Sequence, residues 1–323
     1  MNKNYLQQIN ANIALLLTAT ISGLSFVAQK NGMDFVGPFT FNASRAFLGT
    51  LSLLPVIFIF KLMSMRNDKR KKIVKFRQRV LLAKSGFVCG LVLFLALTVN
   101  QFCMIYAPAG KAGFITSLYV IFVPIISFFM GRKLHLNVKI SVILATIGLY
   151  LLCYKAGSPI ELSDIFLLIS AILFALHILC VGYYSHRVSS VKMSCLQFLV
   201  MFLFSLPCMF IIEHPEWASI VAGAKPILFS GIVVTAIAYT LQVFGQKYAP
   251  PVITALIMSL ESVFAVVGGV WLLNEPIYFK EGCGCIIMLA AIILAQLDLK
   301  FRKFTFPALY RFVRRRIKKI LSK

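Results

Sequence analysis

The sequence predicts an all-α integral membrane protein with ten transmembrane helices arranged as two inverted five-helix repeats. Hydrophobic residues make up 60% of its 323 positions and come in blocks long enough to cross a bilayer, which takes about 20 residues per helix. Basic residues are concentrated in alternate loops between these blocks. A segment of the first half also recurs in the second half. These three features exclude a soluble domain.

Blocks bounded by charges or by proline and glycine clusters define the spans. They lie near residues 10–29, 37–60, 80–104, 112–131, 137–154, 164–184, 194–212, 226–245, 252–273 and 281–298. The first block is interpreted as a retained helix. Its apolar core is longer than that of a secretory signal. No cleavage site of small residues precedes Gln29-Lys30-Asn31, where the block ends.

The placement of the 33 basic residues predicts the orientation in the membrane. With the N-terminus inside, 27 of them fall on the inner side and Arg45 falls within a span. The outer loops carry only Lys30, Lys111, Lys155, Lys225 and Lys280. This asymmetry follows the positive-inside rule and predicts that both termini are cytoplasmic. The net charge of +23 therefore indicates orientation, and no nucleic-acid partner is expected.

The eight cysteines lie in or beside apolar spans, so no disulfide framework is predicted. Cys283-Gly-Cys285 lacks the second pair of ligands that a zinc site needs and is interpreted as a pair of small packing residues. No metal and no cofactor are expected.

An internal repeat divides the chain. Residues 106–124 align without gaps on residues 248–266, a shift of 142, with Tyr-Ala-Pro, Ile, Ser-Leu and Phe in common. Residues 13–19 and 165–171 show a fainter similarity. Because each half holds five spans, the second must enter the membrane from the opposite side. The predicted units are a first repeat at 1–156, a second at 157–299 and a cytoplasmic tail at 300–323.

The tail is basic and amphipathic. Four apolar residues fall on one face of a helix and basic residues cover the rest; the four are Leu309, Val313, Ile317 and Ile320. This pattern is typical of a helix that lies on anionic lipids of the inner leaflet. A disordered basic tail is the alternative.

Six short motifs stand out along the chain: SGLSFVAQK at 22–30, ASR at 43–45, AGFITSLYVIFVP at 112–124, SDIFLLISA at 163–171, SLESVFA at 259–265 and WLLNE at 271–275. In their order and spacing they resemble the motifs of the drug/metabolite transporter superfamily, EamA branch. The resemblance extends to about residue 299. It departs from the family at Ser262, where the usual motif Ser-Leu-Glu-Pro has proline, so the usual kink of the ninth helix is not predicted. The carboxylate is also not duplicated, because Tyr119 stands at the position of the first repeat that matches Glu261.

This resemblance implies a secondary transporter of a small metabolite, either amino acid-like or drug-like, in a bacterial cytoplasmic membrane. One repeat would rock against the other around a site at the midplane, with export and proton coupling as the expected mode. The sequence contains no Walker motif, so direct use of ATP is not expected. An integral membrane enzyme or a non-transporting scaffold is the alternative, although the motifs of metal-dependent membrane enzymes are lacking. The sequence does not decide whether the protein is a monomer or a homodimer.

Glu261 is the first candidate site residue. It lies near the centre of the ninth span, where a charged side chain costs about 2.5 to 3.5 kcal/mol. It must therefore face the interior of the bundle, carry a proton or have a partner, and Arg45 is the candidate partner. Glu261 either binds a cationic part of the solute or a coupling proton, or it has a structural role.

Four further polar residues inside the spans complete the candidate site: Asn100, Gln242, His177 and Gln197. The shift of 142 relates Asn100 to Gln242, so these two are expected to flank the cavity from the third and eighth spans. His177 is a candidate proton relay, because its charge changes near neutral pH. For all four the alternative is a hydrogen bond between helices, worth about 0.6 kcal/mol.

Overall fold

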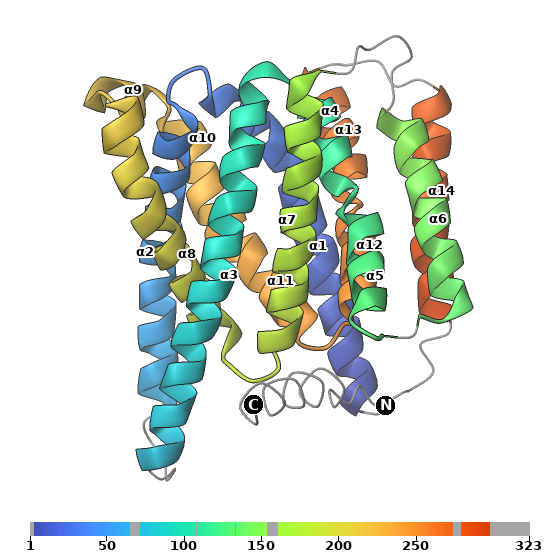
Figure 1. Ribbon diagram of the computed structural model, residues 1–323, viewed down its shortest axis with the longest axis horizontal. Coiled ribbons are helices and arrows are strands. Elements are labelled where there is room, and N and C mark those ends of the chain that lie inside the picture. Colours follow the sequence, from blue (N-terminus) through green and yellow to red (C-terminus); the bar gives the residue numbers. More distant parts are fainter. Residues whose placement is uncertain are drawn as a thin grey trace, which may run out of the picture.

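The computed structural model describes residues 3–64, 72–107, 109–132, 134–153, 161–273 and 279–297. The tail predicted at 300–323 and the boundary predicted at 156/157 lie outside these residues. Within them every regular element is a helix, and the helices run roughly side by side as a bundle (Figure 1). The end drawn uppermost in Figure 1, where α7 begins, is called the upper end below, and the opposite end is called the lower end.

The first half contains α1 (Lys3–Gly32), α2 (Pro38–Ser64), α3 (Lys72–Tyr106), α4 (Ala109–Ser117), α5 (Tyr119–Phe129) and α6 (Leu136–Cys153). The second half begins with α7 (Leu162–Tyr184), α8 (Ser190–Cys208), the π-helical segment η1 (Met209–Glu213), α9 (Trp217–Ala222) and α10 (Ala224–Leu228). It continues with the π-helical segment η2 (Phe229–Ala238), α11 (Tyr239–Gln246), α12 (Pro251–Met258), α13 (Glu261–Leu273) and α14 (Phe279–Leu297).

Eight helical stretches in the described residues are long and apolar enough to cross a membrane. The prediction of an all-helical, multi-pass membrane protein is therefore confirmed. Leu136–Leu152 is apolar but shorter, and α14 is not among the eight. The count of ten transmembrane helices and their inverted arrangement stay predictions, although every predicted span overlaps a helical segment.

Two of the spans are broken near their middle, at positions that the internal repeat relates. The first break falls at Leu118, between α4 and α5, and the second at residues 259–260, between α12 and α13. Leu118 N–H donates to the Ile115 carbonyl, and Leu260 N–H donates to the Ile257 carbonyl, both at 3.2 Å. The ninth span is thus interrupted without a proline at 262, because a local tightening of the backbone makes the break.

Gly23 brings α1 against the broken ninth span. A Cβ atom on Gly23 would lie 2.4 Å from the Glu261 carbonyl oxygen and 2.7 Å from the Phe264 Cβ. Only glycine leaves room for the two helices at this distance, as at other close helix crossings in membranes. The crossing places the polar face of α1 beside Glu261.

The segment η2 is held to α1 by a side chain. The hydroxyl of Thr18 is shared between two carbonyl oxygens. One belongs to Ala238, the last residue of η2, at 3.0 Å, and the other belongs to Ala14, at 2.9 Å. Segments of π-helix leave backbone carbonyls displaced from the α-helical pattern and are frequent at functional sites. Thr18 thus holds the end of η2 against α1, directly before Tyr239, the first residue of α11.

The first turn of α2 depends on a carboxylate from the second half. Glu213 accepts hydrogen bonds from Phe39 N–H, Thr40 N–H and the Thr40 hydroxyl, each at 2.7 Å. We expect Glu213→Ala to lower the free energy of unfolding by about 1 to 2 kcal/mol, because it leaves these donors without a cap. Thermal unfolding in detergent measures this loss. Glu216→Ala, three residues on and exposed, is the control, and an equal loss in both variants would contradict the prediction.

Candidate functional site

A cavity lined by both polar and apolar side chains lies inside the bundle, between the two halves of the chain. Its volume is about 50 Å³, room for a few water molecules, since one water needs about 10 to 15 Å³ of such space. The polar lining consists of Ser22, Ser25, Gln29, Arg45, Asn100, Thr116, Tyr119, His177, Tyr239, Gln242 and Glu261. The apolar lining consists of Phe26, Leu97, Phe174, Ile178, Val234 and Met258.

Glu261 lies at the second helix break and is 6% exposed. Its Oε1 accepts hydrogen bonds from the Tyr119 hydroxyl at 2.9 Å and from the Ser117 hydroxyl at 3.1 Å. Ser117 Oγ is also 2.8 Å from Ser262 Oγ. The residues at the two breaks therefore contact one another, and Tyr119 meets its own counterpart in the repeat.

Arg45 lies on the same cavity but does not pair with Glu261. Its Nη1 donates to Gln29 Oε1 at 3.2 Å, and Tyr239 lies beside the guanidinium. Arg45 is 1% exposed, and its Nε has no hydrogen-bond partner among the described residues. The predicted ion pair is not formed, because hydroxyl groups of α4 and α5 occupy Glu261 while α1 supplies the partner of Arg45.

The other predicted residues divide into two groups. Asn100, Gln242 and His177 line the cavity, and Asn100 Nδ2 donates to the Thr116 hydroxyl at 2.7 Å. Gln197 does not line it. Its Oε1 lies 3.3 Å from His177 Nε2, so it contacts the imidazole from outside the cavity.

Sequence reasoning missed several lining residues. Ser22, Ser25 and Gln29 recur at helical spacing along α1, and this pattern could have indicated a polar face. Tyr239 lies three residues before Gln242 in α11, and this helical spacing could have indicated it as well.

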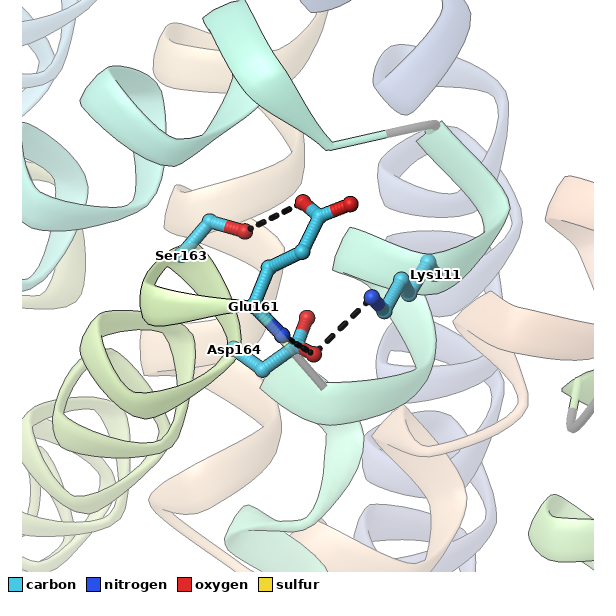
Figure 2. Close-up of polar contacts among 4 residues, drawn as sticks. All are labelled: Lys111, Glu161, Ser163 and Asp164. Atoms are coloured by element: carbon cyan, nitrogen blue, oxygen red, sulfur yellow. Dashed lines mark hydrogen bonds and ion pairs between the residues drawn. The ribbon is translucent and has the colours of Figure 1, made fainter. Parts of the chain in front are cut away.

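An ion pair links the two halves at the upper end of the bundle. Lys111 Nζ of α4 lies 2.8 Å from Asp164 Oδ2 in the first turn of α7 (Figure 2). The same Asp164 oxygen accepts a hydrogen bond from Glu161 N–H at 2.9 Å, and Ser163 Oγ donates to Glu161 Oε2 at 3.2 Å. Asp164 thus caps α7 and holds α4 at once.

The hydroxyl of Tyr119 gives a direct test of the contact with Glu261. We expect Tyr119→Phe to lower the free energy of unfolding by about 1 to 3 kcal/mol, because a buried polar group loses a partner. In the Glu261→Gln background the same change is expected to cost less, and the difference measures the coupling between the two side chains. Tyr106→Phe, on an exposed side chain, is the control. Additive losses in the double variant would contradict the contact.

The fold and the cavity define a helical, multi-pass membrane protein with a buried polar site between its halves. The model of the EamA-like transporter family matches residues 9–154 and 161–297. The chain belongs to the EamA-like transporter family. It is therefore a membrane transporter in its broad class, and this membership indicates a transporter rather than an enzyme.

Individual proteins also resemble the chain. It is 29% identical over 293 residues to an uncharacterized transporter of Archaeoglobus fulgidus, covering 90% of this chain and 87% of that protein. A crystal structure of a protein matches with a TM-score of 0.70 at 15% identity, covering 89% of this chain and 96% of that chain. The second likeness shows a common fold alone.

Proposed function

We propose that this protein is a secondary transporter that exports a small amino acid-like solute from the cytoplasm by alternating access. One observation carries the proposal: a buried carboxylate and a buried guanidinium, Glu261 and Arg45, face one cavity without pairing. A buried charge without a counter-charge is costly. A zwitterionic solute supplies a counter-charge to each residue, with its carboxylate on Arg45 and its ammonium group on Glu261.

The remaining lining fits the same kind of solute. Apolar side chains such as Phe26, Phe174 and Met258 provide a surface for an apolar side chain of the solute. Asn100 and Gln242 provide amide groups that can hydrogen-bond to polar groups of the solute. The cavity has to widen when a metabolite binds, which alternating access of one half against the other provides.

Glu261 supports proton coupling in this proposal. Its carboxylate can hold either a proton or the ammonium group of the solute, but not both. Competition for one carboxylate makes proton entry and solute exit alternate. The charge asymmetry supports a cytoplasmic membrane with the lower end facing the cytoplasm. A drug-like cation that uses Glu261 alone is the second candidate solute.

Untargeted mass spectrometry of medium and cell extract tests the proposal. Cells would express the wild type, Glu261→Gln or an empty vector. We expect one zwitterionic compound to move from the extract to the medium only with the wild type. A compound that shifts equally with Glu261→Gln would contradict the role of the carboxylate. The absence of any shift, followed by no flux in proteoliposomes, would contradict transport and favour a scaffold.

A further inference from the structure

The lower ends of α7 and α11 form a fixed platform that the transport cavity does not use. A Cβ atom on Gly182 of α7 would lie 2.9 Å from Pro251 Cγ at the start of α12, so the turn between α11 and α12 lies directly against α7. Beneath it is a hydrophobic cluster whose buried members are Cys89, Val181, Tyr184, Met193 and Val243. Side chains at this end are therefore carried on a rigid base.

Three groups that bear or can take positive charge gather on this platform: His186, Arg187 and Lys247. Partial burial lowers the pKa of His186 below its ordinary value, and the nearby Lys247 and Arg187 lower it further. Both permanent charges therefore lie close to the imidazole. The side chains of His186 and Arg187 reach the surface, although one side of the imidazole is covered, and Lys247 is half-buried.

Tyrosine rings hold the two permanent charges in place. The Arg187 guanidinium lies 4.4 Å from the centre of the Tyr183 ring, and Arg187 Nη1 donates to the Tyr183 hydroxyl at 3.1 Å. Lys247 Nζ lies 5.8 Å from the centre of the Tyr248 ring. These contacts fix the position of each cation, and Arg187 has further N–H donors besides the one that it gives to Tyr183.

No carboxylate balances these charges in the part of the chain that the structure describes. Its acidic residues lie at the upper end of the bundle, apart from Glu261 at the cavity; they are Asp34, Glu161, Asp164, Glu213, Glu216 and Glu281. Among the described residues, the platform thus offers two fixed cations without an acidic neighbour. An anionic ligand from outside the chain complements it.

We propose that Arg187, Lys247 and His186 form a binding site for the phosphate headgroup of an anionic phospholipid. The site lies at the end of membrane-spanning helices, where lipid headgroups lie and tyrosines are enriched. An apolar surface continues it into the membrane: Phe244 is 37% exposed, and its ring centre is 5.7 Å from that of Tyr248. This surface gives an acyl chain a contact that a free phosphate does not use. The proposal does not depend on which solute is transported.

Native mass spectrometry of the purified full chain tests the site. The probes are phosphatidylglycerol and phosphatidylcholine with identical acyl chains, and the variants are R187Q/K247Q and the control R77Q/R79Q, which removes two basic residues of α3 at the same end. We expect R187Q/K247Q to weaken phosphatidylglycerol binding about 25-fold, because each of the two basic side chains near an anionic headgroup contributes roughly a fivefold gain in affinity. R77Q/R79Q is expected to bind like the wild type.

A charge-preserving variant, R187K/K247R, separates binding from folding. It is expected to retain the preference for phosphatidylglycerol, and its melting temperature shows whether the platform is intact. Equal weakening in the two glutamine variants would overturn the proposal, because binding would then belong to the basic lower end as a whole. Equal binding of phosphatidylcholine, or full displacement of the lipid by inorganic phosphate, would also overturn it.

Discussion

Glu261→Gln is expected to reduce transport at least about tenfold while the protein stays folded. Glutamine keeps the size of the side chain and an oxygen that accepts from Tyr119 and Ser117. It loses the negative charge, and a hydrogen bond to a charged group contributes about 1.5 to 3 kcal/mol, where about 1.4 kcal/mol is a factor of ten. Flux of the solute into proteoliposomes measures the loss.

The matched control for this variant is Glu281→Gln. Glu281 lies in the first turn of α14, away from the cavity lining, and its replacement is expected to leave flux unchanged. Similar melting temperatures of the two variants would show that both are folded. Equal flux in Glu261→Gln and the wild type would remove Glu261 from the site and leave it a structural role at the helix break.

Substitutions at Gly23 are expected to lower both the melting temperature and the rate of transport. The added Cβ would meet the backbone oxygen of Glu261 at 2.4 Å, and backbone cannot move as a flexible side chain can. Overpacking of this kind costs about 1 to 3 kcal/mol, so Gly23→Ala should lower the melting temperature and Gly23→Leu should lower it more. Transport should fall as well, because Glu261 moves away from Tyr119.

Gly113→Ala is the control for this crossing. A Cβ there would lie 3.5 Å from the nearest atom of Phe26, which is ordinary van der Waals contact. We expect that variant to fold and transport like the wild type. If Gly23→Ala melted at the same temperature as Gly113→Ala, the close approach of α1 to α13 would be contradicted.

Much of the helical architecture could be predicted from the sequence, because the bilayer requires long apolar segments and hydropathy reports them directly. The break at residues 259–260 could not be predicted from proline, since Ser262 stands at that position. The internal repeat relates this break to the one in the first half, but the sequence indicates neither of them. Leu118 and Leu260 are related by the shift of 142, and both lie at a break.

The candidate site was predictable only in part. Residues that hydropathy makes conspicuous, such as Glu261, Arg45 and His177, do line one cavity. Their partners were not predictable, because a pairing depends on which helix faces correspond. Charge alone suggested that Arg45 pairs with Glu261, whereas the packing of α4 and α5 places Tyr119 and Ser117 on the carboxylate.

The central claim is that Arg45 and Glu261 bind opposite ends of one zwitterionic solute. Competition in proteoliposomes tests it most directly, with the solute, its decarboxylated amine and its deaminated acid as competitors. The wild type should be inhibited only by the zwitterion, Arg45→Gln should accept the amine as well, and Glu261→Gln should accept the acid. If both analogues compete with the wild type as strongly as the zwitterion does, the two charges do not define the site.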